Sequence, residues 1–281
     1  MGVNLEYFDV GGGVGINYDG SHTNSLSSTN YHLKDYVFDV VHILKDICDL
    51  QGVGHPHIFS ETGRAVCAHH SCVITQAFGE VNLTKHKSIE IEHKEGEHHL
   101  IKKIKKSFGD LNESNYQDIY NDVSMIKDEV SSAFKLGVID LKERSIAETL
   151  YWNICHQILD ITKDEKFISN EIKELKSVLA DKYLCNFSVF QSAPDIWAIN
   201  QILPIVPISR HNERPSHTCT IADITCDSDG KINSFLEPDE VNKTLPVHEL
   251  GTDDYFLGLF LTGAYQDVMG DMHNLFGRLN E

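Results

Sequence analysis

Apolar and polar positions in the first sixty residues predict a strand, a helix and a second strand. A short apolar run from Tyr7 to Val10 predicts a buried strand, which three consecutive glycines end. From Tyr31 to Gln51 apolar residues recur at helical spacing, and Gly52 stops the pattern. Pro56 to Ser60 predicts a further short strand. This order indicates one βαβ unit of a parallel sheet, with polar motifs at the carboxyl ends of both strands, where such folds place their active sites.

The middle of the chain predicts a helical region. A short helix from Ala65 and a strand around Cys72 to Val81 lead into a charged stretch, Lys85 to Lys106, that has no clear periodicity and indicates a solvated connection. Apolar residues then recur at helical spacing in three stretches: Tyr116 to Phe134, Leu141 to Ile158 and Phe167 to Leu179. Together these stretches predict a small helical bundle.

The last hundred residues change to the pattern of an antiparallel β domain. Turns that carry Pro or Gly separate four strand-like stretches: Tyr183 to Gln191, His217 to Thr225, Ile232 to Leu236 and Tyr255 to Thr262. We therefore predict three parts, which are strand and helix units in 1–83, a charged connection and helices in 84–182, and an antiparallel β domain in 183–281.

Composition narrows the class of protein. The formal net charge of −18 over 281 residues argues against a nucleic-acid partner and would attract a cationic small molecule. No apolar run approaches the roughly 18 residues of a membrane span, and no signal peptide is visible, so we expect a cytoplasmic protein without a membrane partner. The chain starts directly on a core strand and ends as abruptly, which leads us to expect a piece of a longer protein.

The seven cysteines are an odd number in a chain without a secretory signal, which favours reduced thiols over a disulfide framework. Cys67, His69, His70 and Cys72 have the composition of a metal site. No second Cys/His pair has the spacing that would close a zinc site, so we expect no metal there.

The glycine cluster is the first candidate for chemistry. A strand that runs into Gly11, Gly12 and Gly13 can present bare N–H groups to a phosphate. The dinucleotide fingerprint G-x-G-x-x-G does not fit, because Ile16 stands where the third glycine should be. A tight structural turn is the alternative, since glycine runs also mark turns.

Three further motifs each have a functional and a structural interpretation. Glu61 and Arg64 follow a strand and can hold a ring nitrogen and a phosphate, or form a surface ion pair. The Asp-x-Asp-Gly run at Asp227 suits a hairpin turn, and a calcium loop is excluded because Pro238 stands at its twelfth position. Tyr265 is either a core residue or a phenol aimed at a ligand.

The order of these motifs carries more information than any one of them. Asp-Val-Gly-Gly-Gly at 9–13, Glu-x-Gly-Arg at 61–64, Thr-Cys-Asp at 225–227 and Gly-Ala-Tyr at 263–265 follow one another along the chain. In that order they resemble the pyridoxal-phosphate decarboxylases of the alanine-racemase-like fold, among which are the ornithine, diaminopimelate and arginine decarboxylases. Segments 186–192 and 270–277 are similar to those of the biosynthetic arginine decarboxylase subfamily.

The resemblance implies an α/β plus all-β fold: the C-terminal part of a pyridoxal-phosphate-binding (β/α)8 barrel, a helical-bundle insertion and an antiparallel β-barrel domain. It also implies a cofactor, pyridoxal 5′-phosphate, with Mg2+ as a further candidate. The activity implied is the decarboxylation of L-arginine to agmatine in putrescine and spermidine biosynthesis. A related ornithine- or diaminopimelate-type decarboxylase and a non-catalytic, dimerising or regulatory protein are the alternatives.

Residue by residue, the resemblance makes Gly11, Gly12 and Gly13 the phosphate loop and Glu61 the partner of the pyridine nitrogen. A carboxylate there keeps that nitrogen protonated, so that the ring accepts the electron pair left when carbon dioxide departs. The remaining cofactor-binding residues would be Gly63, Arg64 and Tyr265. The substrate-binding stretch would comprise Phe8, Asp9, Val10, Val14, Gly15, Ile16, Asn17 and Tyr18.

The resemblance also assigns a catalytic pair, Cys226 and Asp227, that reaches into the active site of a neighbouring subunit and so implies a homo-oligomer. Cys226 would return a proton to the substrate carbon, and Asp227 would bind the cationic end of the arginine substrate by a bidentate contact. The sequence departs from the family in one respect. No lysine stands at the end of a core strand, since Lys34 and Lys45 lie in the amphipathic helix. We therefore expect the Schiff-base lysine upstream of Met1 and no decarboxylation by this chain alone.

Overall fold

The computed structural model describes residues 5–25, 27–82, 96–163, 165, 167–237, 240–275 and 279–280. The chain divides into two compact units, residues 1–81 together with 182–281, and residues 82–181. Most of the predicted connection between Lys85 and His98, and the last two residues of the 270–277 motif, lie outside the described residues. The three-part division predicted from the sequence stays a prediction.

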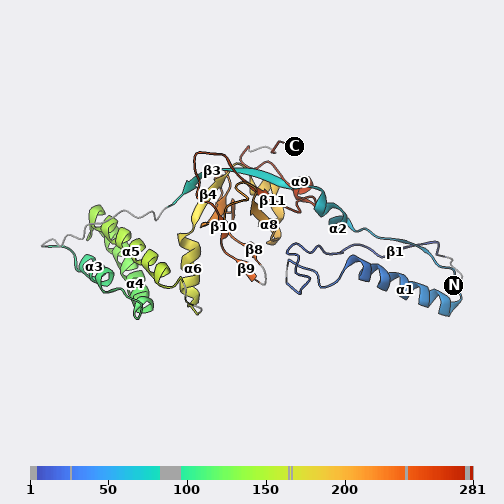
Figure 1. Cartoon of the computed structure of the whole chain (residues 1–281), viewed down its shortest axis with the longest axis horizontal. Helices are drawn as coiled ribbons and strands as arrows, with labels where there is room; N and C mark the ends of the chain where they lie inside the picture. The colour runs from blue at the N-terminus through green and yellow to red at the C-terminus, as the bar shows by residue number, and fades with distance from the viewer. Residues whose placement is uncertain are drawn as a thin grey trace. The chain divides into compact units, whose positions relative to one another are not determined.

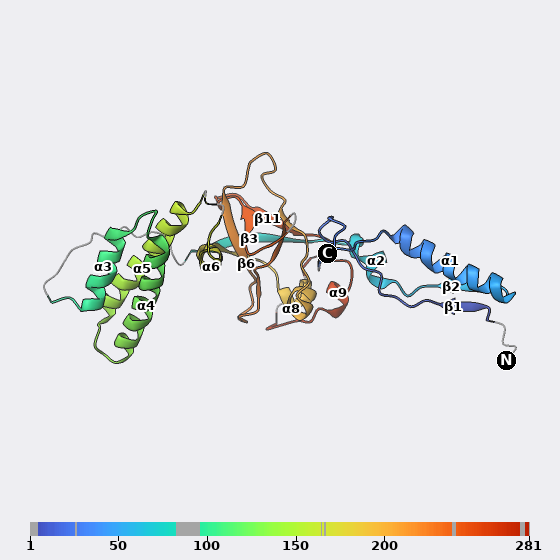
Figure 2. The same ribbon diagram turned by 90° about the horizontal axis from the view of Figure 1, so that it is seen from below.

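The βαβ unit predicted for the N-terminal sixty residues is confirmed. Strand β1 (Tyr7–Asp9) pairs in parallel with β2 (His57–Phe59), and helix α1 (Leu33–Gln51) connects them. Both ribbon views show α1 running alongside the strands (Figures 1 and 2). The helix ends at Gly52, whose φ of 62° is the left-handed conformation typical of a helix C-terminus.

The expectation that β1 is buried is wrong. Tyr7 is 57% exposed, and apolar residues of α1 such as Leu33 and Ile47 are 58% and 54% exposed. Parallel strands are usually covered on both faces by further strands and helices. In the described part of the chain β1 and β2 form a sheet of two strands, so little of their apolar surface is covered.

The antiparallel β domain is also confirmed, and it forms most of the first unit. Seven strands form one sheet in the order β10-β6-β4-β3-β11-β5, with β7 paired to β6, and the end strands β5 and β10 approach one another. Its members are β3 (Val73–Val81), β4 (Asp181–Cys185), β5 (Ile205–Pro207), β6 (His217–Ala222), β7 (Lys231–Ile232), β10 (Leu245–Val247) and β11 (Tyr255–Leu259). Strands β8 (Phe235–Glu237) and β9 (Glu240–Asn242) form a separate pair.

Two details of this unit differ from the sequence pattern. The strand predicted from Tyr183 to Gln191 ends at Cys185, and α7 (Val189–Ser192) follows because the Ser188 hydroxyl accepts a hydrogen bond from the Gln191 amide and caps a helical turn. Strand β3, assigned by sequence to the first part, hydrogen-bonds to β4 and β11 of the last. The short helices around the sheet are α2 (Gly63–Cys67), the 3-10 turn η1 (Ala68–His70), α8 (Pro194–Ile199) and α9 (Gln266–Met269).

The second unit is helical, as predicted: α3, α4 and α5 lie side by side (Figure 2), and α6 contacts α5. It contains α3 (His99–Asp110), α4 (Tyr116–Lys135), α5 (Leu141–Ile161) and α6 (Asn170–Leu179). The solvated connection predicted up to Lys106 is wrong from His99 onward. Leu100, Ile101 and Ile104 of α3 are buried in the helical core, but the lysines between them hide their helical spacing in the sequence.

Unfolding of the helical unit is expected to become easier at alkaline pH. Burial raises the pKa of the Cys155 thiol to about 12 from its usual 9.0. Because the pKa of this thiol is higher in the folded than in the unfolded chain, its protonated form stabilises the fold fully below pH 9. This stabilisation is lost as the pH rises from 9 to 12, at roughly 1 kcal/mol per pH unit. We expect urea unfolding at pH 8 and pH 10, followed by Trp152 fluorescence in a Trp197→Phe background, to show this loss.

The matched variant is Cys155→Ser, whose hydroxyl does not titrate in this range. Its stability is expected to vary less between pH 8 and pH 10. An equal pH dependence in both proteins would show that Cys155 is not the responsible group.

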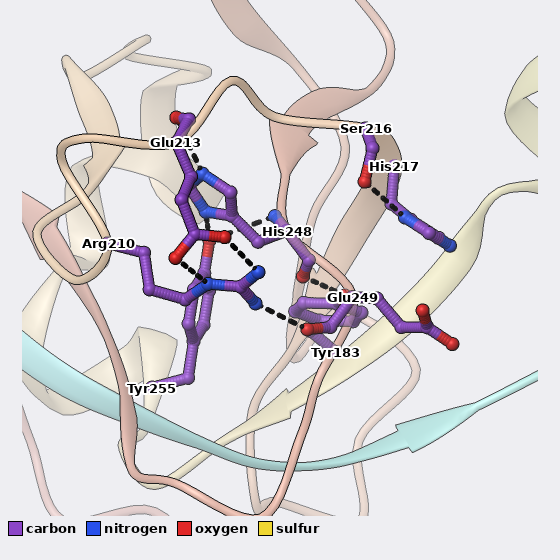
Figure 3. A network of polar contacts seen from close by, with 8 residues as sticks. All are labelled: Tyr183, Arg210, Glu213, Ser216, His217, His248, Glu249 and Tyr255. Carbon is purple, nitrogen blue, oxygen red and sulfur yellow. Dashed lines mark hydrogen bonds and ion pairs between the residues drawn. The ribbon is translucent and has the colours of Figure 1, made fainter.

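A polar network surrounds the buried His248 side chain (Figure 3). His248 Nε2 lies 3.0 Å from the Glu213 carbonyl, which only accepts, so Nε2 carries a hydrogen and Nδ1 accepts from the Tyr255 hydroxyl at 2.8 Å. The Tyr255 oxygen also accepts from the His248 amide, and the Tyr183 hydroxyl donates to the His248 carbonyl at 2.7 Å. Arg210 binds the Glu213 carboxylate and donates to the Glu249 carbonyl. The loops before β6 and before β11 are thereby tied together.

Replacing Tyr255 by Phe is expected to destabilise the chain by about 2 kcal/mol, because the imidazole Nδ1 and the amide of His248 both lose a buried partner. Tyr183→Phe removes the hydroxyl that donates to the His248 carbonyl and is expected to cost about 1 kcal/mol. Denaturant titration of the three proteins measures the difference. Equal loss in the two variants would contradict the double role of the Tyr255 hydroxyl.

Candidate functional site

The glycine loop folds directly against the turn that follows β2. Glu61 donates its amide to the Gly11 carbonyl at 2.9 Å, and the Gly11 amide donates to Asp9 Oδ1 at 2.8 Å. A Cβ on Gly12 would lie 2.7 Å from the Glu61 carbonyl oxygen. Gly11 and Gly13 have φ of 75° and 86°, which residues with a side chain rarely adopt. The loop therefore depends on all three glycines.

Two kinds of unpaired polar group remain at this loop. The amides of Gly12 and Gly13 are exposed and donate to no acceptor in the described part of the chain. The Glu61 carboxylate is also exposed and forms no hydrogen bond or ion pair with a described residue. Free amides suit an anion, and a free carboxylate suits a cationic or N–H-bearing group.

Arg64 lies next to this loop in a network that the sequence pattern does not reveal. Its guanidinium donates to the Tyr18 hydroxyl at 2.9 Å and to Asp195 Oδ2 at 3.1 Å. Desolvation opposes the charge, but the bonds to Tyr18 and Asp195 outweigh it and raise the pKa of Arg64. The guanidinium also lies over the ring of Tyr265, 4.9 Å from the ring centre.

Tyr265 comes within reach through a close approach to Gly63 and a left-handed backbone conformation of its own. A Cβ on Gly63 would lie 3.0 Å from the Tyr265 hydroxyl, so the phenol sits over the start of α2. Tyr265 itself has a φ of 70°, the left-handed region, and is 44% exposed. The structure thus brings the predicted cofactor-binding residues together: the glycine loop, Glu61, Gly63, Arg64 and Tyr265.

Two residues of this cluster were not predicted from the sequence. Asp195 pairs with Arg64, and Gln266 holds the Asp195 carboxylate with its amide at 2.7 Å while accepting from the Asp195 backbone amide at 3.1 Å. Asp195 is the second residue of α8, after Pro194, and an acidic residue in the first turn is a helix-start signal and not a catalytic one. Gln266 directly follows the Gly-Ala-Tyr motif, and that adjacency was the only available signal.

The predicted substrate stretch divides into buried and accessible residues. Val14, Ile16 and Tyr18 are buried, and the Gly15 amide donates to the Tyr31 hydroxyl at 2.9 Å. Phe8 and Asp9 are exposed, whereas Val10 and Asn17 are half-buried. The substrate-binding role of all eight residues stays a prediction.

Cys226 and Asp227 lie on a different loop of the same unit. Both are exposed, and no hydrogen bond or ion pair among the described residues joins either of them to the glycine loop, Glu61, Arg64 or Tyr265. Asn274 donates to Cys226 Sγ at 3.0 Å, the Asp229 amide donates to Asp227 Oδ1 at 3.0 Å, and His273 Nε2 lies 3.7 Å from Asp227 Oδ2. The catalytic roles predicted for this pair stay predictions.

The described residues lack two kinds of feature. No group of three or more His, Cys, Asp or Glu side chains is placed to hold a metal ion. No helix among them combines the length and the apolar character needed to cross a membrane.

Two protein-family models match the chain. The pyridoxal binding domain of the pyridoxal-dependent decarboxylases matches residues 1–68, which contain the glycine loop, Glu61 and Arg64. The arginine decarboxylase helical bundle domain matches residues 94–176, the region of α3 to α6. The chain is thus similar, in two separate regions, to pyridoxal-dependent decarboxylases.

Individual relatives narrow the similarity to biosynthetic arginine decarboxylases. The chain is 44% identical over its whole length to that of Phocaeicola vulgatus, covering 45% of the relative, and 42% identical to that of a Nostoc species, covering 41%. The crystal structure of biosynthetic arginine decarboxylase from Campylobacter jejuni superposes with a TM-score of 0.80 at 34% identity, over 98% of this chain and 44% of that one. The resemblance that the motifs indicated is confirmed, and the chain spans less than half the length of these relatives.

Proposed function

We propose that this chain takes part in the pyridoxal-phosphate-dependent decarboxylation of L-arginine to agmatine, a step of polyamine biosynthesis in the cytoplasm. The observation that supports it most is the juxtaposition of the Gly12 and Gly13 amides with the Glu61 carboxylate, none of which has a polar partner among the described residues. The similarity to biosynthetic arginine decarboxylases along the whole chain supports the substrate and the reaction. The finer architecture proposed is the C-terminal part of a barrel, a helical insertion and a β-barrel domain.

The residues present fit a phosphorylated pyridine. Gly12 leaves the space that a Cβ would fill beside Glu61, so backbone amides stay accessible to a phosphate oxygen. When bound, the cofactor supplies an electron-accepting ring, and Glu61 would hold the proton on its pyridine nitrogen. Tyr265 would donate its phenol O–H toward the phosphate, and Arg64 beneath that ring would hold the phenol in place and add positive charge.

The substrate and the partner follow from the remaining charges. Asp227 presents an exposed carboxylate that suits the guanidinium of arginine by a bidentate contact. Because no polar contact between described residues joins Asp227 to the glycine loop of its own chain, the pair Cys226 and Asp227 would act on the site of a second subunit. A homo-oligomer is therefore part of the proposal, and Mg2+ remains a candidate cofactor without an assigned site.

The test uses pyridoxine 5′-phosphate, which has the ring and the phosphate of the cofactor but no aldehyde to react with lysines. We expect the chain to bind it in a calorimetric titration, and to bind pyridoxine without the phosphate at least about tenfold more weakly, a difference of ~1.4 kcal/mol. Gly12→Ala is expected to weaken binding about tenfold or more, because its Cβ would press on the Glu61 carbonyl.

Gly54→Ala is the matched control, since a Cβ there meets no atom within 4 Å and the φ of Gly54 is not in the left-handed region. It is expected to bind like the unchanged chain. Glu61→Gln keeps the shape of the side chain and is expected to weaken binding of the ring while leaving inorganic phosphate binding unchanged. Equal affinities for the Gly12 and Gly54 variants would contradict the phosphate loop.

A further inference from the structure

The loop that carries Cys226 and Asp227 is anchored at both ends by one buried carboxylate. Asp223 Oδ1 accepts the amide and the hydroxyl of Thr225, and Asp223 Oδ2 accepts the Val189 amide. Gly230 closes the loop, and a Cβ there would lie 2.2 Å from Asp223 Oδ1. The position of Cys226, one residue after Thr225, is therefore set by the core.

The segment that faces this loop is anchored independently. Gly270 lies against the Gln191 carbonyl, because a Cβ on it would be 2.0 Å from that oxygen. His273 stacks on Phe190 with ring centres 4.2 Å apart, and Phe190 packs edge-on against Trp197 at 5.2 Å. The backbone before Asn274 is thus held by α7 and by an aromatic stack.

Asn274 links the two anchored segments. Its side-chain amide donates to Cys226 Sγ at 3.0 Å, a short distance for a hydrogen bond to sulfur. Its φ is 53°, the left-handed region in which Asn is among the best tolerated residues with a side chain. The neighbouring His273 places Nε2 3.7 Å from Asp227 Oδ2, so the same segment lies over both residues of the predicted catalytic pair.

We propose that Asn274 is a positioning residue for Cys226, holding the sulfur through an N–H···S hydrogen bond and stabilising negative charge on it. The inference rests on the proposed function for its chemical meaning. In that reaction the S–H bond of Cys226 breaks, and the proton joins the substrate carbon, which uses the electron pair left by carbon dioxide. The sulfur is left as a thiolate that regains a proton from solvent, and the Asn274 amide stabilises it in the interval.

The test follows alkylation of individual cysteines by iodoacetamide, because only the thiolate reacts. Cys226 and Cys72 are both exposed, so Cys72 serves as an internal reference, while buried Cys185 and Cys219 report unfolding. In Asn274→Asp a carboxylate replaces the amide donor at nearly unchanged size, and the ratio of Cys226 to Cys72 alkylation rates is expected to fall about fivefold or more. Asn274→Gly keeps a residue suited to positive φ but removes the donor, and a fall of about twofold to fivefold is expected.

The outcomes separate the possible roles. An unchanged rate ratio in Asn274→Asp, with Cys185 and Cys219 still protected, would overturn the proposal. If Asn274→Asp fails to fold, the buried thiols become labelled and Asn274→Gly decides in the same way. The measurement needs neither cofactor nor substrate. A changed rate ratio together with absent pyridoxine 5′-phosphate binding would therefore keep the positioning role and reject the proposed function.

Discussion

Gly263→Ala is expected to destabilise the β-sheet unit by about 3 kcal/mol, the upper end of the usual cost of overpacking a core. A Cβ on Gly263 would lie 2.0 Å from the Cys67 carbonyl oxygen and 2.8 Å from His70 Nδ1. The Cys67 carbonyl cannot move freely, because the neighbouring Ala68 is fully buried and its carbonyl accepts the Gly263 amide. The melting temperature is expected to fall by roughly 6–12 °C for a unit of this size.

Gly251→Ala is the control for that measurement, because Gly251 is exposed and a Cβ on it would meet nothing within 4 Å. Scanning calorimetry of the two variants beside the unchanged chain gives the comparison. A Gly263 variant that melts within 1 °C of the Gly251 variant would show that the backbone of η1 can shift at little cost in free energy. The close approach matters for function because Gly263 directly precedes the Ala-Tyr pair that places Tyr265 over Gly63.

Asp223→Ala is expected to destabilise the same unit by about 3 kcal/mol, since it leaves the Val189 and Thr225 amides without an acceptor. Val189 is fully buried, so its amide cannot turn to solvent instead. Chemical denaturation followed by Trp197 fluorescence in a Trp152→Phe background reports this unit. Iodoacetamide labelling of Cys226 is expected to change as well, because its loop loses one anchor.

Two further variants define that effect. Asp223→Asn keeps one acceptor oxygen and is expected to lose less than Asp223→Ala. Asp253→Ala removes an exposed carboxylate that has no hydrogen-bond partner among the described residues, and it is expected to change stability by less than about 0.5 kcal/mol. Similar losses from the Asp223 and Asp253 variants to Ala would contradict the anchoring role of the buried carboxylate.

Long periodic segments were predictable because their pattern repeats often enough to outweigh local exceptions. Helix α1, with five turns of apolar spacing and a glycine stop, and the helices α4 and α5 are examples. Strands β5 and β10 have three residues each, too few for alternation to appear. Helix α3 was missed for a different reason, since its buried positions are interspersed with lysines whose charged ends mask them.

Residues of the candidate site could be predicted from the sequence where their residue type has one main structural role. Gly11 and Gly13 have positive φ, and Gly12 has no room for a side chain, so their backbone role could be predicted from the glycine run alone. Asp195 and Asn274 carry no such signal. Aspartate at a helix start and asparagine in a loop are ordinary structural choices, so only their contacts with Arg64 and Cys226 reveal them.

The sequence by itself determined the long periodic elements of this protein, the order of its motifs and, through that order, the family it resembles. These features depend on residues near one another in the chain, where spacing and backbone preference act directly. Only the tertiary structure decided which distant groups meet, such as Arg64 with Asp195 and Tyr265, or Cys226 with Asn274. Such contacts depend on sheet pairing and close packing between segments far apart in sequence, which no local pattern encodes.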